Sequence, residues 1–499
     1  MEILKQMERE YVVTVKAGVD IDQFDAEMKA STGAGAIPNR TVDVVDQRPG
    51  NVRNTHYALT EEEVETLKAD DRVEDVEIPP EQDPGIIIEP YGRQTGNFNK
   101  TTSSSGSHHN WGLRRCMVES NPFSGNNVTG DYTYNLDGTG VDVVIQDTGI
   151  QKDHPEFKDA DGNSRVKEID WYSTSSINGT QASNFYTDGN GHGTHVAGTV
   201  AGLTYGWAKN ADIYAQKIAL SGISGGISIY RCFDLIRDWH NNKGTNRPTV
   251  VNMSWGSGRY FTNINGGNYR GTSWTGSSRQ TQYGMVGSYY FGAGYRYGIR
   301  VASYDADVEQ MISAGIHVCI AAGNSSQKID LPGGVDYNNY FNEGSTRRYY
   351  HRGGSPYSSN AFMVGNLDYS YHSGGLEQKN ISSENGPGVP IYAPGSYIRS
   401  AWISGGGSTY HLDSNFRQRS ITGTSMASPQ VAGVAACMLQ AYPKLTPAEL
   451  RQRLLDRTST GNIYDTGLDN DYTDSRSIKG GNDNLLHYPY IKENALTIT

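Results

Sequence analysis

Residues 423–429 read Gly-Thr-Ser-Met-Ala-Ser-Pro and place Ser425 in a turn of small residues that opens an apolar, helix-like run. A serine hydroxyl is a weak nucleophile unless a neighbouring base takes its proton. His192 and Asp147, both upstream, are the residues that can supply such a base and an acid to orient it. The chain order Asp, His, Ser is one of those found in serine-hydrolase triads, so these three residues are the first candidates for catalysis.

The motifs around these residues resemble those of subtilisin-like serine proteases, the subtilase family. They are Val141-Asp-Val-Val-Ile-Gln-Asp147, Asp188-Gly-Asn-Gly-His-Gly-Thr-His-Val-Ala-Gly198, Val251-Asn-Met-Ser-Trp-Gly256, Ala321-Ala-Gly-Asn324 and Gly423-Thr-Ser-Met-Ala-Ser-Pro429. The histidine motif is most similar to the proteinase K and thermitase branches, and the resemblance covers most of residues 108–460. Gln430 stands where the family usually has histidine and Thr148 where it usually has serine, but neither replaces an atom of the triad.

The resemblance implies a role for each motif residue. Ser425 attacks the peptide carbonyl, His192 transfers the proton and Asp147 orients the imidazole. Asn324 and the backbone N–H of Ser425 stabilise the oxyanion, while Gly193 is expected to permit a tight turn after His192. The edge that pairs with extended substrate is expected at Ser254, Trp255 and Gly256. Each residue alone has an ordinary structural explanation, but together they predict a serine endopeptidase that forms an acyl-enzyme intermediate.

Strand-like and helix-like runs alternate between residues 141 and 460. This predicts an α/β fold, a doubly wound parallel sheet with helices on both faces, which is subtilisin-like by the resemblance. The strands are expected at 141–147, 212–218, 248–254 and 316–322. The helices are expected at 192–202, 229–241, 303–314, 425–440 and 446–456. Functional residues of such folds gather at the carboxyl ends of strands, where Asp147 and Asn324 are expected to lie.

Residues 1–83 are predicted to form a separate acidic unit, because they carry the whole formal net charge of −11. Their pattern of strand, helix, strand, strand, helix and strand predicts a small ferredoxin-like α+β domain. The segment Thr60-Glu-Glu-Glu63 is a capping box that begins the second helix. This unit resembles the inhibitory propeptide of subtilases, so it is expected to act as an intramolecular inhibitor. The alternative is an unrelated small α+β domain.

Residues 84–107 are rich in Pro, Gly, Ser, Thr and Asn, which predicts a linker that holds a self-cleavage site. The catalytic domain is expected over 108–499. Compared with the family pattern, the Gly- and Tyr-rich segments 257–300 and 325–360 look like insertions. They are expected to be either irregular loops packed on the enzyme's surface or an added wall that restricts substrates or docks a partner. Without an overall basic excess, nucleic acid is not an expected partner.

The predicted chemistry requires no cofactor. Asp188 and the loop Asp159-Ala-Asp-Gly-Asn163 carry oxygen ligands that permit calcium, but no residue is assigned to a metal. His192 and His195 have the spacing of a zinc pair, yet no third ligand is evident. His195 is therefore expected to be structural.

No stretch approaches the ~20 apolar residues of a membrane-spanning helix, so no membrane partner is expected. The charged segment 1–10 lacks the apolar core of a signal peptide, which predicts a cytoplasmic or virion-associated protein rather than a secreted one.

Two alternative functions compete with that of a self-processing protease zymogen. One is a structural or virion-associated module that cleaves itself once, and the other is a processing protease with one dedicated target.

Overall fold

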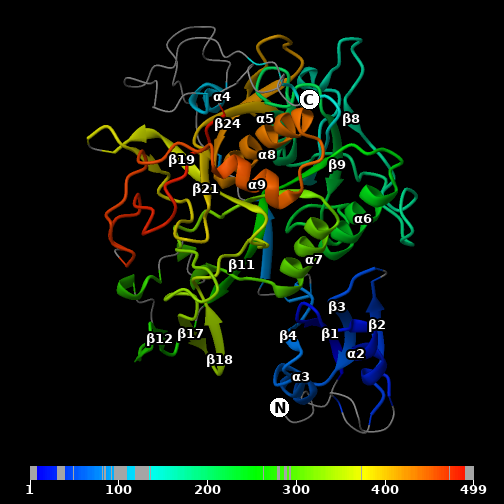
Figure 1. The fold of residues 1–499 in the computed structure, drawn as a ribbon, viewed down its shortest axis with the longest axis vertical. Coiled ribbons are helices and arrows are strands. Elements are labelled where there is room, and N and C mark those ends of the chain that lie inside the picture. Colours follow the sequence, from blue (N-terminus) through cyan, green and yellow to red (C-terminus); the bar gives the residue numbers. More distant parts are fainter. Residues whose placement is uncertain are drawn as a thin grey trace.

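The structure, a computed structural model, describes residues 8–30, 37, 40–48, 50–80, 82–83, 86–90, 93–94, 110–117, 134, 136–261, 263–277, 281–285, 289–290, 294–372, 374–470 and 472–488. Figure 1 shows a small N-terminal unit below a larger unit that is built on a central sheet. Within these ranges, none of the helices has both the length and the apolar character needed to span a bilayer.

The N-terminal unit is a four-stranded antiparallel sheet in the order β2-β3-β1-β4, packed against two helices. Its elements are β1 (Arg9–Val15), α2 (Ile21–Met28), β2 (Val44–Gln47), β3 (Asn54–Leu59), α3 (Glu61–Lys68) and β4 (Val73–Glu77). Side chains cap both helices: Asp20 accepts from the Gln23 N–H, and Thr60 and Glu63 form the expected capping box. The predicted order of strands and helices is confirmed.

The larger unit is built on an eight-stranded sheet in the order β20-β19-β16-β10-β7-β9-β8, with β21 beside β19. Its strands are β7 (Asp142–Asp147), β8 (Val166–Lys167), β9 (Asp212–Lys217), β10 (Thr249–Met253), β16 (His317–Ala321), β19 (Phe362–Tyr371), β20 (Glu377–Lys379) and β21 (Ile391–Pro394). The strands run parallel, apart from β20, which is antiparallel to β19. The helices of this unit are α4 (Trp111–Arg115), α5 (His192–Ala201), α6 (Ile229–Asn242), α7 (Ala302–Ser313), α8 (Thr424–Ala441) and α9 (Pro447–Leu455).

Both faces of the central sheet are buried, which explains why apolar residues occupy consecutive positions in its middle strands. In β7, Val143 and Ile145 join a core that contains residues of α5 and α8. Val144, between them, joins a second core that contains residues of α6 and α7. Successive side chains of a strand point to opposite faces of the sheet. The core with α5 and α8 and the core with α6 and α7 therefore lie on opposite faces. The predicted doubly wound α/β fold is therefore confirmed.

Each predicted strand and helix of this unit is observed, with bounds that differ by at most one residue at either end. The periodicity does not predict β19, because the buried apolar residues end at Leu367 whereas the strand continues to Tyr371. A smaller antiparallel sheet lies outside the predicted elements. It contains β22 (Ile398–Trp402), β23 (Ser408–Thr409) and β24 (Arg417–Thr422).

The two predicted insertions form regular strands that meet in space, so the expectation of irregular loops is wrong. In the first, β11 (Trp255–Phe261) pairs with β15 (Gly294–Gly298), which pairs with β14 (Tyr289–Tyr290). A second sheet joins both segments in the order β13-β12-β17-β18. Its strands are β12 (Gly267–Tyr269), β13 (Thr272–Trp274), β17 (Tyr340–Glu343) and β18 (Thr346–Tyr349). The cause is a shared, mostly aromatic core of Phe261, Ile264, Trp274, Met285, Tyr297, Phe341 and Tyr350.

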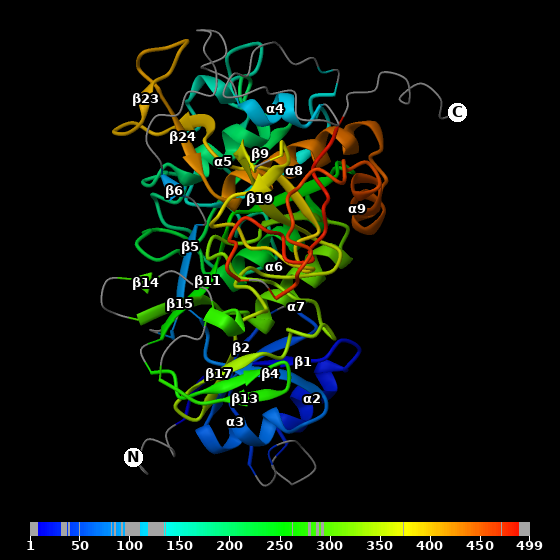
Figure 2. The same ribbon diagram turned by 90° about the vertical axis from the view of Figure 1, so that its left-hand side faces the viewer.

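The predicted linker also contains strands. β5 (Ile86–Pro90) pairs antiparallel with β11, and Figure 2 shows the two strands side by side. β6 (Arg93–Gln94) pairs antiparallel with β24. The remainder of 84–107 lies outside the described residues.

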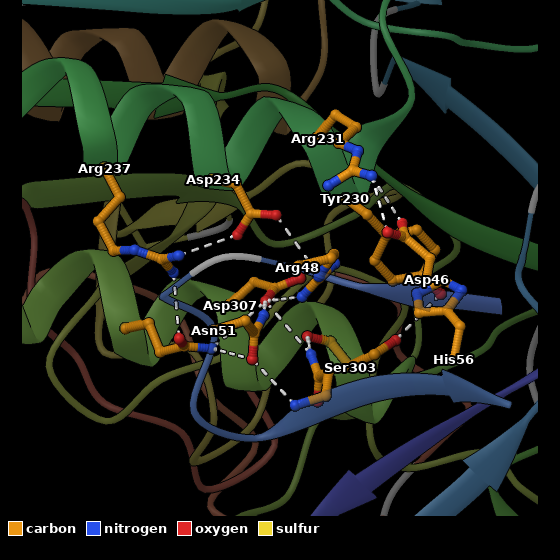
Figure 3. A network of polar contacts seen from close by, with 12 residues as sticks. Asp46, Arg48, Asn51, His56, Tyr230, Arg231, Asp234, Arg237, Ser303 and Asp307 are labelled. Atoms are coloured by element: carbon orange, nitrogen blue, oxygen red, sulfur yellow. Dashed lines mark hydrogen bonds and ion pairs between the residues drawn. The ribbon is translucent and has the colours of Figure 1, made fainter. Parts of the chain in front are cut away.

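A buried ion network centred on Arg48 joins the N-terminal unit to α6 and α7 (Figure 3). The fully buried guanidinium lies 2.5 Å from Asp307 Oδ1 through Nη2 and 3.5 Å from Asp234 Oδ2 through Nε. Asn51 and Asn54 also donate to Asp307 Oδ1, at 2.8 and 3.2 Å. Burial raises the pKa of Asp307 to about 6, and the charge of Arg48 opposes that rise. The two acids are therefore accommodated in this interface because the guanidinium lies between them.

Replacing Arg48 by methionine should weaken the docking of the N-terminal unit by about 3–5 kcal/mol, because two buried carboxylates lose their shared cation. Native-state hydrogen exchange measures this loss as a lower opening free energy for the amides of β3 and the first turn of α7.

Arg231→Gln is the matched control. Arg231 contacts Asp46 across the same interface at 2.8 Å, but the two side chains are 26% and 31% exposed. Loss of so exposed an ion pair should cost about 0–1 kcal/mol. Equal costs for the two variants would contradict a dominant role for the buried network.

Candidate active site

The predicted catalytic residues lie at the carboxyl edge of the central sheet. Asp147 is the last residue of β7, and Asn324 follows β16. His192 is the first residue of α5, and Ser425 is the second residue of α8. Parallel strands that are neighbours end at the same edge, which brings these residues together from distant parts of the chain.

Asp147 and His192 form a buried pair. His192 Nδ1 lies 2.8 Å from Asp147 Oδ1, and both side chains are almost fully buried. A carboxylate only accepts hydrogen bonds, so Nδ1 carries the proton, and in the neutral ring Nε2 is an acceptor. Among the described residues, Nε2 has no hydrogen-bond partner. The pair therefore presents a basic nitrogen that can take a proton.

Ser425 is tied to the end of β10 rather than to the histidine. Its hydroxyl donates to the Ser254 carbonyl at 3.1 Å, and the Ser254 hydroxyl donates to the Ser425 carbonyl at 3.1 Å. Since β10 is the neighbour of β7, this link holds Ser425 at the edge that carries Asp147. Transfer of the serine proton to His192 requires the hydroxyl to rotate away from Ser254. Catalytic hydrogen bonds are often loose before substrate binds.

Asn324 is held in a fixed orientation by the residue before the serine. Its Oδ1 accepts from the Thr424 N–H at 2.9 Å and from the Thr424 hydroxyl at 3.2 Å. The hydroxyl of Thr424 in turn accepts from the Gly323 N–H at 3.1 Å. Because the backbone N–H of Thr424 can only donate, the atom of Asn324 that faces it is the amide oxygen. The NH₂ group of Asn324 therefore points away from Thr424.

The approach of α5 to β7 depends on glycine. A Cβ at Gly193 would lie 2.2 Å from the Gly149 carbonyl oxygen and 3.2 Å from Asp147 Oδ1. The residue with the left-handed turn is Gly191, with φ of +94°. The expectation that Gly193 permits a tight turn is therefore wrong. Gly193 is required by close contact, whereas Gly191 makes the turn.

Asp188 organises the loop that carries His192. Its Oδ1 accepts from the Thr148 hydroxyl and from the N–H groups of Asn190 and Gly191, and its Oδ2 accepts from the N–H and hydroxyl of Thr194. These donors satisfy the carboxylate without a cation. No group of three or more His, Cys, Asp or Glu suited to a metal occurs in the described part of the chain. Calcium binding stays a prediction.

His195 ties α5 to the smaller sheet. Its Nε2 lies 2.9 Å from the Ile398 carbonyl and 3.1 Å from the Arg419 carbonyl, which makes it a donor to β22 and β24. Burial lowers the pKa of His195 to about 3, so the ring is neutral. These contacts are those of a structural histidine.

The predicted substrate edge is paired with the chain's own β5. Trp255 lies opposite Pro90 and Gly256 opposite Glu89, and the pairing continues to Arg259 opposite Ile86. The Trp255 side chain is fully buried, and its indole N–H donates to Gln146 at 3.0 Å. Trp255 thus presents only its backbone at this edge.

One positioning residue escapes the sequence patterns. Buried Glu384 accepts from the N–H groups of Ser325 and Gln327, which follow Asn324, and its own N–H donates to the Gly323 carbonyl. It lies in a Ser-, Asn- and Gly-rich stretch that carries no motif. Gln430 bonds the indole of Trp207 at 2.7 Å and the amide of Asn110, just before α4. This residue, noted in the sequence as a departure from the family pattern, therefore links α8 to the segment before α4.

Comparisons with known proteins agree on one family. The profile of the subtilase family of peptidases matches residues 138–477. Proteinase R of Parengyodontium album is 28% identical over 86% of this chain and 79% of that protein. A cuticle-degrading protease of Metarhizium anisopliae is 30% identical over 72% of this chain and 67% of that protein. The chain spans 55% of alkaline serine exoprotease A of Vibrio alginolyticus, at 28% identity over 82% of this chain.

The fold also occurs among solved structures. Fervidolysin of Fervidobacterium pennivorans, a keratinolytic enzyme related to subtilisin, superposes with a TM-score of 0.53 over 97% of this chain and 62% of its own, at 19% identity.

Glu384 should make stability depend on pH. Burial raises its pKa from 4.5 to about 8. Its contribution to stability is therefore present below pH 4.5 and is lost as the pH rises through about 8, because the unfolded chain releases this proton first. Glu384→Gln should remove this part of the dependence, of order a few kcal/mol. Calorimetry at pH 5 and pH 8 should show a smaller fall in Tm for the variant than for the wild type.

Glu449→Gln serves as the control. Hydrogen bonds from Thr446 lower the pKa of Glu449, so its stabilising effect is lost only on acidification below its usual range. The change of Tm between pH 5 and 8 should match the wild type. Parallel curves for Glu384→Gln and the wild type would show that Glu384 is not the group responsible.

Proposed function

Because the chain belongs to the subtilase family, we propose that it is a serine endopeptidase that cleaves peptide bonds through Ser425, His192 and Asp147. The observation that carries this proposal is the buried 2.8 Å contact between His192 Nδ1 and Asp147, which leaves Nε2 as the basic nitrogen. Substrates are proteins or peptides that pair as an extended strand with the backbone at Ser254, Trp255 and Gly256.

The reaction follows from the placement of these groups. Ser425 Oγ attacks the carbonyl carbon while His192 Nε2 takes the hydroxyl proton, and Asp147 stabilises the resulting imidazolium. The developing oxyanion accepts from the Asn324 amide and the Ser425 N–H, near the positive end of α8. His192 then protonates the leaving amine, and the acyl-enzyme forms. Water, deprotonated by His192, attacks this ester, and His192 returns the proton to Ser425 Oγ as the acid product leaves.

Asn324→Ala should lower kcat by about 10²–10³ with a smaller change in KM, because the donor acts mainly on the transition state. Steady-state hydrolysis of a peptide measures both constants. The same preparation should be checked by Tm, since the substitution also removes the bonds to Thr424.

Asn360→Ala, at an exposed position, is the control and should leave kcat at the wild-type value. If Asn324→Ala lost less than about threefold in kcat, Asn324 would not be an oxyanion donor of the usual strength.

We also propose that the protein is a self-processing zymogen whose N-terminal unit inhibits it. Support comes from the path of the chain: β5 pairs with β11, and β6 pairs with β24, the strand that leads into α8 and Ser425. The segment between Pro90 and Arg93 therefore joins β5, which pairs with β11, to β6, which pairs with the strand just before Ser425. Self-cleavage is proposed at one of the three bonds between these residues. The Arg48 network then keeps the cleaved unit docked as an inhibitor.

Intact mass spectrometry tests the zymogen. The wild type should separate into a fragment that ends at residue 90, 91 or 92 and its complement, whereas Ser425→Ala should keep the full mass. Full-length wild type that still hydrolyses peptide would refute self-processing but not the peptidase. Cleavage of both proteins would point to a contaminating protease and not to Ser425.

A further inference from the structure

We propose that Arg259 forms a substrate subsite for a carboxylate side chain, well upstream of the cleaved bond. This inference rests on the proposed peptidase function and adds a recognition element to it. The subsite favours protein substrates that offer an extended strand preceded by Asp or Glu.

The strand that pairs with substrate is longer than the edge at Ser254, Trp255 and Gly256. β11 continues into the first insertion, and its pairing with β5 runs without a break from Trp255 opposite Pro90 to Arg259 opposite Ile86. Each further pair of an antiparallel ladder holds an extended chain in one register. A substrate that follows β5 is therefore guided along β11 as far as Arg259.

At the end of this ladder, Arg259 binds the side chain of Asp83. Its Nη1 lies 2.8 Å from Asp83 Oδ1 and 2.7 Å from Oδ2. The side chains are only 20% and 18% exposed. Charge-assisted bonds of this kind are stronger than neutral ones, and partial burial reduces screening. Asp83 lies three residues before Ile86, on the substrate-like side of the proposed cleavage bond.

The second insertion positions Arg259 independently of Asp83. Glu343, on β17, lies 3.6 Å from Arg259 Nε and 3.0 Å from both Nε and Nη2 of Arg348. Both guanidinium groups lie 6.0 Å from the ring centre of Phe261. Without Asp83, two arginines share one carboxylate, so the cluster keeps a net positive charge. Departure of the N-terminal fragment would therefore leave an oriented cation that suits an incoming acid.

A competition assay tests the subsite with the full-length protein as expressed. Two peptides that span residues 80–98 of this chain, one with Asp and one with Asn at position 83, are mixed in one tube. Mass spectrometry follows the products that end between residues 90 and 92. The ratio of the two kcat/KM values does not depend on how much enzyme is folded, so a poorly folding variant still gives a valid ratio.

The wild type should prefer the Asp peptide by roughly five- to twentyfold, as for a partly buried charge-assisted pair. Arg259→Gln should bring the ratio near one. Arg259→Glu should reverse the preference towards a peptide with Lys at position 83. Arg347→Gln is the matched control, since Arg347 is an exposed arginine on β18 that stacks on Tyr340, and its ratio should equal that of the wild type.

Equal hydrolysis of both peptides by the wild type would overturn the subsite while leaving the peptidase intact. An unchanged ratio in Arg259→Gln would overturn it as well. If the wild type cleaved neither peptide, its intact mass would separate a failed peptidase, which stays full-length, from a self-cleaved enzyme blocked by its docked N-terminal unit. In either case the contact would be judged in the uncleaved Ser425→Ala chain. There, additive Tm changes for Asp83→Asn and Arg259→Gln would overturn the subsite, and non-additive changes would support it.

Discussion

Strands β7, β10 and β16 are parallel neighbours, and everything at the site depends on this arrangement. Because parallel neighbours end at one edge, Asp147, Ser254 and Asn324 emerge side by side although they are far apart in sequence. Helices α5 and α8 then bring His192 and Ser425 to the same edge. Both faces of the sheet are covered by helices, so groups that must reach a substrate can lie only where the strands end.

Contacts behind the site hold its donors and acceptors. Asp188 accepts hydrogen bonds from the loop before His192, and Thr424 orients the amide of Asn324. Glu384 accepts hydrogen bonds from the loop that follows Asn324. These groups touch no reacting atom in the proposed mechanism. They remove freedom from the groups that do, which is how a buried polar network lowers the cost of organising a transition state.

The N-terminal unit and the insertions act on the same edge from outside the central sheet. The ion network of Arg48 sets the unit against α6 and α7, and β5 then lies along β11. The insertions lengthen β11 and bring Glu343 and Arg348 to its far end. Their aromatic residues form a core of their own, which accounts for strands where loops are expected. The N-terminal unit and the insertions thus converge on the backbone proposed to bind substrate.

The sequence by itself determined the α/β fold, the bounds of its main helices and strands, the N-terminal α+β unit and the candidate residues at 147, 192, 324 and 425. Those features depend on local signals such as apolar periodicity, capping boxes and short motifs. Only the tertiary structure decided that Arg48 meets Asp307, that β12 of one insertion pairs with β17 of the other, and that Glu384 supports Asn324. These contacts join residues far apart in the chain, and their partners are chosen by which buried surfaces meet, which no local pattern records.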